Sequence, residues 1–114
     1  MHNPSIDKVM EKIRCTFPDR DEKEIYRQLQ AYGTESYERE NLRVYLAILK
    51  LCSEKGLSKL SHYINEAKND YRDVLSWAEY PNEIKSPVYD ERTPEKIEKV
   101  RKLDQSQYNH WLNG

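Results

Sequence analysis

Apolar residues recur along the chain at the three- and four-residue spacing of amphipathic helices, and the alternation typical of strands is nearly absent. A first helix is predicted to begin after Ser5 and to stop at Pro18, because the residue before a proline is pushed out of the helical region. A second begins at Asp21, with Glu24 at the spacing of a capping box, and ends at Gly33. The pattern therefore predicts two short helices joined by a turn.

The third predicted helix spans about residues 36–53. From Leu42 to Cys52 it is apolar around most of its circumference, which is typical of a helix at the centre of a bundle. Its first turns are charged and are expected to be exposed, and Gly56 ends it. We therefore expect this helix to organise the core.

Residues 57–81 are predicted to form a helical pair. Ser58 can cap the first helix and Asp70 the second, where Asp73 would face the positive end of the helix dipole. Pro81 closes the pair. Asp70 thus marks the start of a short helix that follows the one capped by Ser58.

The last quarter of the chain is predicted to hold one loop and one helix. Residues 82–93 carry the weakest helical pattern and are expected to form an extended loop over the bundle. Thr93 followed by Pro94 is a typical helix start. The C-terminal helix, residues 94–112, has an apolar stripe that Asp104 interrupts, so we expect it to pack by one narrow face.

Together these elements predict an all-α fold, a single-domain bundle of five to six helices over residues 1–114. A chain of 114 residues and 13.7 kDa, 37% of them hydrophobic, can bury one small core. Charged residues make up 34%, but the net charge is only -1, so the high net charge typical of disorder is absent.

Composition also excludes several classes of function. No apolar run approaches the length of a membrane span, and the amino terminus lacks the features of a signal peptide. Acidic and basic residues are balanced along the chain, so no basic stripe marks a nucleic-acid surface. Cys15 and Cys52 lack CxxC spacing and fall on predicted apolar faces, so we expect both to be reduced thiols that form neither a disulfide nor a metal site. We therefore expect a cytoplasmic protein with no membrane and no nucleic-acid partner.

The sequence offers no recognised reactive motif. It has no phosphate-binding loop, no nucleophile elbow and no histidine pair at metal-binding spacing. We therefore predict no catalytic residue, no metal site and no cofactor. The nine tyrosines are spread along the chain from Tyr26 to Tyr108, and we expect them to bury their rings while their hydroxyls stay in water.

The first half of the chain contains a set of apolar residues at characteristic spacings: Phe17-Pro18, then Ile25 and Leu29, then Ala47-Ile48 and Leu51. The spacing resembles that of the ubiquitin-binding CUE domains, a branch of the UBA-like fold, over roughly residues 6–52. Thr16 and Cys52 depart from the family pattern, as does the longer stretch between the second and third helices.

The resemblance implies a UBA-like three-helix N-terminal unit, residues 5–53, with a C-terminal helical extension. It also implies an interaction surface formed by Phe17, Pro18 and Leu51. The alternative is that these side chains only fill the interior of a small bundle.

A second resemblance covers about residues 36–112. The segment DYRDVLSWAEYP at residues 70–81 carries it, with AILKL before it and QYNHWL near the end. These segments resemble a family of small bacterial proteins of no assigned function. The resemblance implies a bacterial cytoplasmic protein and gives no reaction.

The same segment concentrates polar residues. Asp70, Arg72, Asp73 and Glu79 could form a cleft in which the arginine holds an anion and a carboxylate acts as a base. The alternative is structural: caps, dipole contacts and a salt link from Arg72 to a neighbouring helix.

The sequence thus favours a protein-interaction module without catalytic activity, whose partner is a protein of unknown identity. It would present either the Phe17-Pro18/Leu51 edge or the 70–80 segment. The candidate binding residues in that segment are Tyr71, Arg72, Asp73, Glu79 and Tyr80. The alternative is a small-ligand binder or an enzyme that uses the polar cluster.

Overall fold

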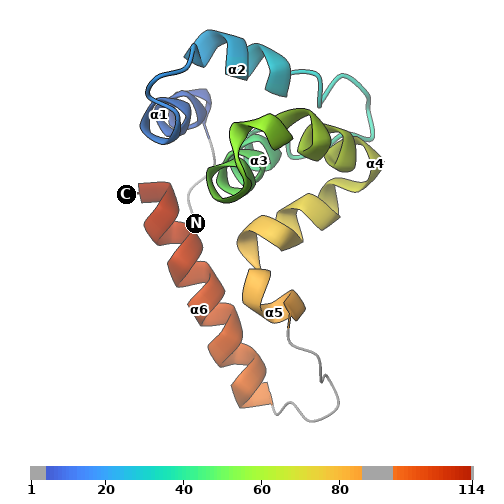
Figure 1. Cartoon of the computed structure of the whole chain (residues 1–114). Coiled ribbons are helices and arrows are strands. Elements are labelled where there is room, and N and C mark those ends of the chain that lie inside the picture. The colour runs from blue at the N-terminus through green and yellow to red at the C-terminus, as the bar shows by residue number, and fades with distance from the viewer. Residues whose placement is uncertain (1–4, 86–93, 114) are drawn as a thin grey trace.

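The computed structural model describes residues 5–85 and 94–113, and within them it contains six α-helices and no strand (Figure 1). The elements are α1 (Ile6–Thr16), α2 (Glu22–Leu29), α3 (Asn41–Lys55), the 3-10 turn η1 (Leu57–Lys59), α4 (Leu60–Glu79), α5 (Pro81–Lys85) and α6 (Pro94–Asn113). The predicted all-α single-domain bundle is confirmed.

The first two helices begin at the predicted caps. The Lys8 N–H donates to the Ser5 hydroxyl at 3.1 Å, and the Lys23 N–H donates to the Asp21 carboxylate at 3.0 Å. Both bonds satisfy a donor that the helix leaves free in its first turn. The capping box is only half formed, because the Glu24 carboxylate binds Arg27 instead of reaching back.

Helix α3 forms the centre of the molecule, with α1 on one side and α4 on the other (Figure 1). Its residues 44–52 are all buried, as expected of a central helix. The predicted start at residue 36 was wrong. Residues 33–40 form a loop, because Glu38 turns inward and Glu40 adopts a left-handed φ of 59°, which interrupts a helix.

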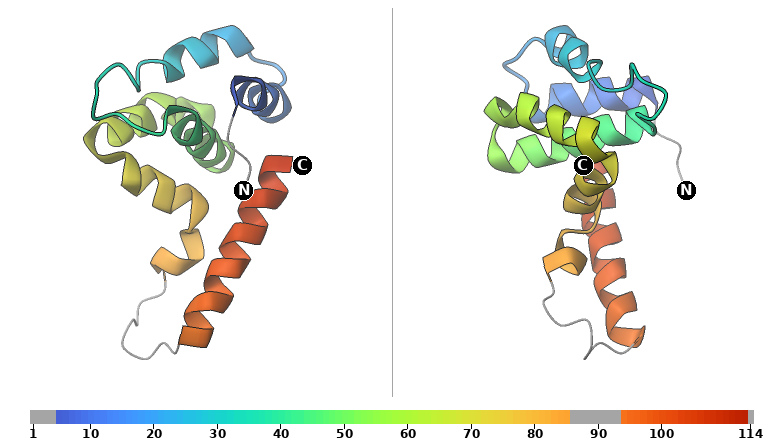
Figure 2. Two further views of the ribbon diagram at one scale, coloured as in Figure 1. Left: turned by 180° about the vertical axis from the view of Figure 1, so that it is seen from behind. Right: turned by 90° about the vertical axis from the view of Figure 1, so that its right-hand side faces the viewer.

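The predicted helical pair corresponds to α4, which non-helical backbone at Asp70 divides into two helical segments. Asp70 has extended backbone angles, φ -159° and ψ 102°, and its carboxylate accepts from the Arg72 N–H at 3.1 Å. The predicted cap at Asp70 is therefore confirmed, and the axis of α4 bends there (Figure 2). The predicted cap at Ser58 was wrong, since Ser58 lies inside η1 and makes no side-chain cap.

The predicted loop at residues 82–93 was wrong at its start, and residues 86–93 lie outside the described residues. Pro81 opens α5, at the first helical position where proline is favoured. The Asp104 carboxylate of α6 accepts from the N–H groups of Asn82 and Glu83 at 3.1 and 3.0 Å. Asp104 is only 1% exposed, so the residue that interrupts the apolar stripe caps α5.

Helix α6 runs along α4 and α5 and extends below the other helices (Figure 2). At its other end the buried Lys12 ammonium of α1 binds the Trp111 carbonyl and lies 4.4 Å from the centre of the Trp111 ring. A cation at the carboxyl end of a helix complements the helix dipole. Polar contacts thus hold α6 near its middle, through Asp104, and near its C-terminal end, through Trp111.

Over residues 5–85 and 94–113, none of the helices has both the length and the apolar content to cross a bilayer. Both cysteines are free thiols, but only Cys52 is buried. The apolar face predicted for Cys15 was wrong, because α1 turns that side chain to the surface.

Candidate functional site

The Phe17-Pro18/Leu51 edge is mostly interior. Leu51 is 5% exposed, and Phe17 packs against the buried core. Phe17 is only partly buried, and Pro18 is exposed. The geometry thus matches the alternative in which these residues fill the bundle.

The polar residues of the 70–80 segment do not converge on one point. Glu79 faces α3, where the Arg43 guanidinium donates to both of its carboxylate oxygens, at 2.8 and 2.6 Å. This hydrogen-bonded carboxylate raises the pKa of Arg43. The salt link between helices therefore exists, but it joins Arg43 rather than Arg72 to a carboxylate.

Arg72 pairs within its own helix. Its guanidinium donates to both oxygens of Asp70 at 2.9 Å, and its side chain remains 76% exposed. The hydrogen bonds from Arg72 lower the pKa of Asp70. Asp73 is exposed in the turn that Asp70 caps, and Tyr80 is half-buried where α4 ends. The predicted link from Arg72 to a neighbouring helix was wrong.

A hollow of about 360 Å³ lies between the 33–40 loop and the kink of α4. It brings Tyr71 and Arg72 together with residues that the sequence did not single out as binding residues. Its lining residues are Tyr37, Glu38, Arg39, Ala67, Lys68, Asn69, Asp70, Tyr71 and Arg72. We refer to this feature as the kink hollow.

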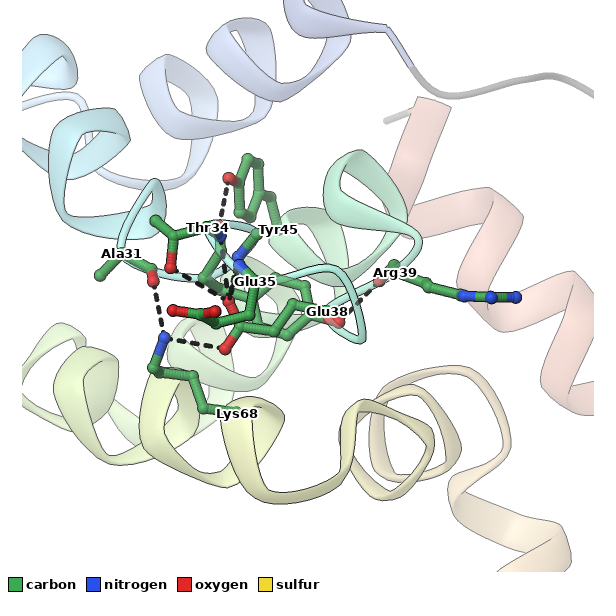
Figure 3. Close-up of polar contacts among 9 residues, drawn as sticks. Ala31, Thr34, Glu35, Glu38, Arg39, Tyr45 and Lys68 are labelled. Carbon is green, nitrogen blue, oxygen red and sulfur yellow. Dashed lines mark hydrogen bonds and ion pairs between the residues drawn. The ribbon is translucent and has the colours of Figure 1, made fainter.

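Glu38 shapes one wall of the kink hollow (Figure 3). Its side chain is 0% exposed and accepts from the N–H groups of Gly33, Thr34 and Glu35 at 2.8, 3.0 and 3.2 Å. The Lys68 ammonium of α4 donates to the same carboxylate at 2.8 Å. A buried charge needs partners of this kind, and here they join the loop to α4.

These contacts set the ionisation of Glu38. Burial alone would raise the pKa of the carboxyl group, but the Lys68 ammonium and the N–H groups of Gly33 and Glu35 outweigh it and hold that pKa at about 2. Glu38 is therefore an anion throughout the physiological pH range. Its role is structural: the carboxylate binds the N–H groups of the loop and the Lys68 ammonium, and it does not act as a proton acceptor.

Two tyrosines support the loop from the core side. The Tyr32 hydroxyl donates to the Arg39 carbonyl at 2.6 Å, and the Tyr45 hydroxyl donates to the Tyr32 carbonyl at 2.8 Å. Burial raises the pKa of Tyr32. The expectation that tyrosine hydroxyls stay in water was wrong for this pair, because backbone carbonyls take the place of water.

The groups that remain open at the kink hollow are suited to binding. Tyr37 is 65% exposed, and the Arg39 side chain extends away from the Glu38 contacts (Figure 3). The two carboxylates of the hollow, Glu38 and Asp70, are each engaged by a cation. In the described part of the chain no three His, Cys, Asp or Glu side chains lie close enough to hold a metal ion.

The sequence did not point to Tyr37, Arg39 or Lys68 as binding residues. Tyr37 and Arg39 lie in the stretch predicted to be the first turns of a helix, and Lys68 looks like any charged helix residue. The available signal was the run of charges beside Gly33, which is unusual for the start of a buried helix.

No protein-family model matches the chain, and neither a curated protein nor a solved structure does. The two family resemblances therefore stay predictions, and function has to be inferred from the site itself.

Proposed function

We propose that the protein is a small interaction module without catalytic activity, which binds a partner protein at the kink hollow. One observation carries the proposal: an exposed tyrosine, Tyr37, and two exposed arginines, Arg39 and Arg72, gather around one concave surface. Tyrosine and arginine are the residue types that most often anchor protein interfaces.

Contacts within the walls support the proposal. Glu38 joins the loop to α4 through Lys68, and Asp70 accepts two hydrogen bonds from the Arg72 guanidinium. A surface whose side chains are already ordered loses less conformational entropy when a partner binds. Such a surface is a better binding site than the same residues on a free loop.

An enzyme or a small-ligand binder is the less favoured alternative. It would use Asp70, Arg72, Asp73 and Glu79. Of these, Asp70 and Arg72 line the kink hollow but are paired with each other, and Glu79 faces α3 and pairs with Arg43. The kink hollow is also open and lined mainly by polar groups, whereas most small-ligand sites are largely apolar and enclosed.

The proposal includes a setting in the bacterial cytoplasm, which the resemblance of residues 70–81 implies. The free thiols of Cys15 and Cys52 are compatible with a reducing compartment. In that setting a UBA-like unit at residues 5–53 would be a scaffold for the kink hollow.

Site-specific photocrosslinking in cells that express the full chain tests the proposal. A photoreactive amino acid replaces Tyr37, Pro18 or Leu103 in separate variants; Leu103 is a matched control because it is an exposed apolar residue of α6. We expect a discrete protein adduct from position 37 only. The purified adduct partner should then bind the full chain, and Tyr37→Ala should weaken that binding.

Two results would contradict the proposal. One is an adduct that forms only from position 18 or only from position 103. The other is a purified partner whose affinity is unchanged by Tyr37→Ala in a variant with unchanged helicity.

A further inference from the structure

We infer that the partner segment is acidic: the guanidinium groups of Arg39 and Arg72 hold an aspartate or glutamate carboxylate, while a neighbouring apolar side chain lies on the Tyr37 ring. This inference rests on the proposed function and specifies the chemistry of the partner. Its basis is the charge that the kink hollow presents to solvent.

The lining of the kink hollow has one more cation than carboxylate. Glu38 is paired with Lys68 and Asp70 with Arg72, which leaves Arg39 as the third lining cation. One of those carboxylates, Glu38, is fully buried behind the loop. An acidic segment would therefore be attracted to this surface by local charge and not by the overall charge of the protein.

The two arginines differ in what already binds them. Arg72 gives two of its donors to Asp70, and a guanidinium has further N–H groups that can reach a second carboxylate. Asp70 thereby orients Arg72 without using all of its donors. Arg39 is anchored through its backbone carbonyl to Tyr32, and its side chain extends outward from the loop (Figure 3).

Glu35 limits how much negative charge the site can take. Glu35 is exposed and lies near the Lys68 ammonium. The Glu38 hydrogen bond raises the pKa of Lys68 most, and the Glu35 charge raises it further. A segment with one or two carboxylates fits better than a long acidic run, because like charges repel. Removing the Glu35 charge should therefore tighten binding.

Fluorescence anisotropy with the full chain tests the inference. The probe is a short labelled peptide with glutamates on both sides of one tryptophan, and the matched control peptide has glutamine at each glutamate. We expect binding of the acidic peptide and at least about tenfold weaker binding of the glutamine peptide, since charge-assisted hydrogen bonds are lost. A single-stranded oligonucleotide serves as a second probe.

Variants locate the site. Arg39→Glu and Arg72→Glu should each weaken binding of the acidic peptide by about tenfold or more. Lys55→Glu makes the same change in charge at the far end of α3, roughly 20 Å from its start, and should change binding far less. Glu35→Gln should strengthen binding severalfold, and circular dichroism should show the same helicity in all four variants.

The inference is overturned if the glutamine peptide binds as well as the acidic one, if the arginine variants lose no more than Lys55→Glu, or if the oligonucleotide is preferred. If the acidic peptide does not bind but the crosslinked partner still depends on Tyr37, the partner is not acidic and the proposed function stands. If the acidic peptide does not bind and the crosslinked partner does not depend on Tyr37, both the inference and the proposed function are rejected.

Discussion

The body of the molecule, α1 to α4, and the C-terminal arm, α5 and α6, are held together by different forces. Among the side chains that the structure describes, every buried hydrophobic residue lies between Val9 and Ala78, so the body holds the core. The arm contributes a buried Asp104, the partly buried Trp111 and Leu112, and ion pairs such as Arg101 with Glu83 at 3.1 Å.

The body and the arm therefore differ in what their contacts contribute: those of the body mainly stabilise the fold, and those of the arm mainly fix the position of α5 and α6. Burial of apolar area is the larger and non-directional contribution, and it stabilises the body as a unit. Hydrogen bonds contribute less net free energy but fix geometry. We therefore expect the arm to open locally before the body unfolds, and the kink hollow, which is built on the body, to remain ordered.

The largest effect is expected in the core. Leu49→Ala removes a fully buried side chain of α3 and should lower the free energy of unfolding by about 2–5 kcal/mol, because a cavity is left behind. Urea denaturation followed by circular dichroism measures it. A loss no larger than that of the exposed control Lys55→Ala would show that α3 does not organise the body.

The second effect concerns pH. A pKa of about 2 for Glu38, against an ordinary value of 4.5, corresponds to on the order of 3 kcal/mol of stability at neutral pH. Because the folded pKa is the lower one, this stability is complete above pH 4.5 and is lost as the pH falls toward 2. Glu38→Gln should lower stability at pH 7 and flatten that acid dependence. An unchanged acid profile in the variant would contradict the role of Glu38.

The third effect should be confined to the arm. Asp104→Ala leaves the amides of Asn82 and Glu83 without their acceptor, and loss of a helix cap costs about 1–2 kcal/mol. Hydrogen exchange should speed up in α5 and α6 and stay unchanged in α3. Equal loss of protection in α3 would mean that arm and body form one cooperative unit.

The smallest effect is expected where the C-terminal end of α6 meets α1. Lys12→Met keeps the packing of the stem against Trp111 but removes the ammonium. The hydrogen bond to the Trp111 carbonyl is lost, together with a contact to the ring that is worth about 2 kcal/mol at a buried site. Relief of the burial of a charge offsets much of that loss. The melting temperature and tryptophan fluorescence should change only slightly, and a loss comparable to that of Leu49→Ala would contradict the distinction between arm and body.

The body was largely predictable from the sequence because its signals are local. The caps at Ser5, Asp21 and Asp70 act within three residues of themselves, and the apolar run of α3 is visible as a pattern. Each of these features is decided by residues that are neighbours in the chain.

The loop and the arm were not predictable because their polar contacts join distant segments. Lys68 lies 30 residues from Glu38, and Asp104 lies 22 residues from Asn82. A charged residue in a helical pattern is usually a solvated one, so nothing in the sequence marks these carboxylates as buried. The kink hollow depends on the contact between Lys68 and Glu38. The sequence therefore identified only two of its residues, Tyr71 and Arg72, as candidate binding residues.

The most direct test of the central claim is a titration of the isotope-labelled full chain with the acidic peptide, followed by amide chemical shifts. The account predicts that the largest shifts fall in residues 37–39 and 67–72, with α6 unaffected. Shifts concentrated in α6 or around Pro18, or no shifts at peptide concentrations far above that of the protein, would contradict it.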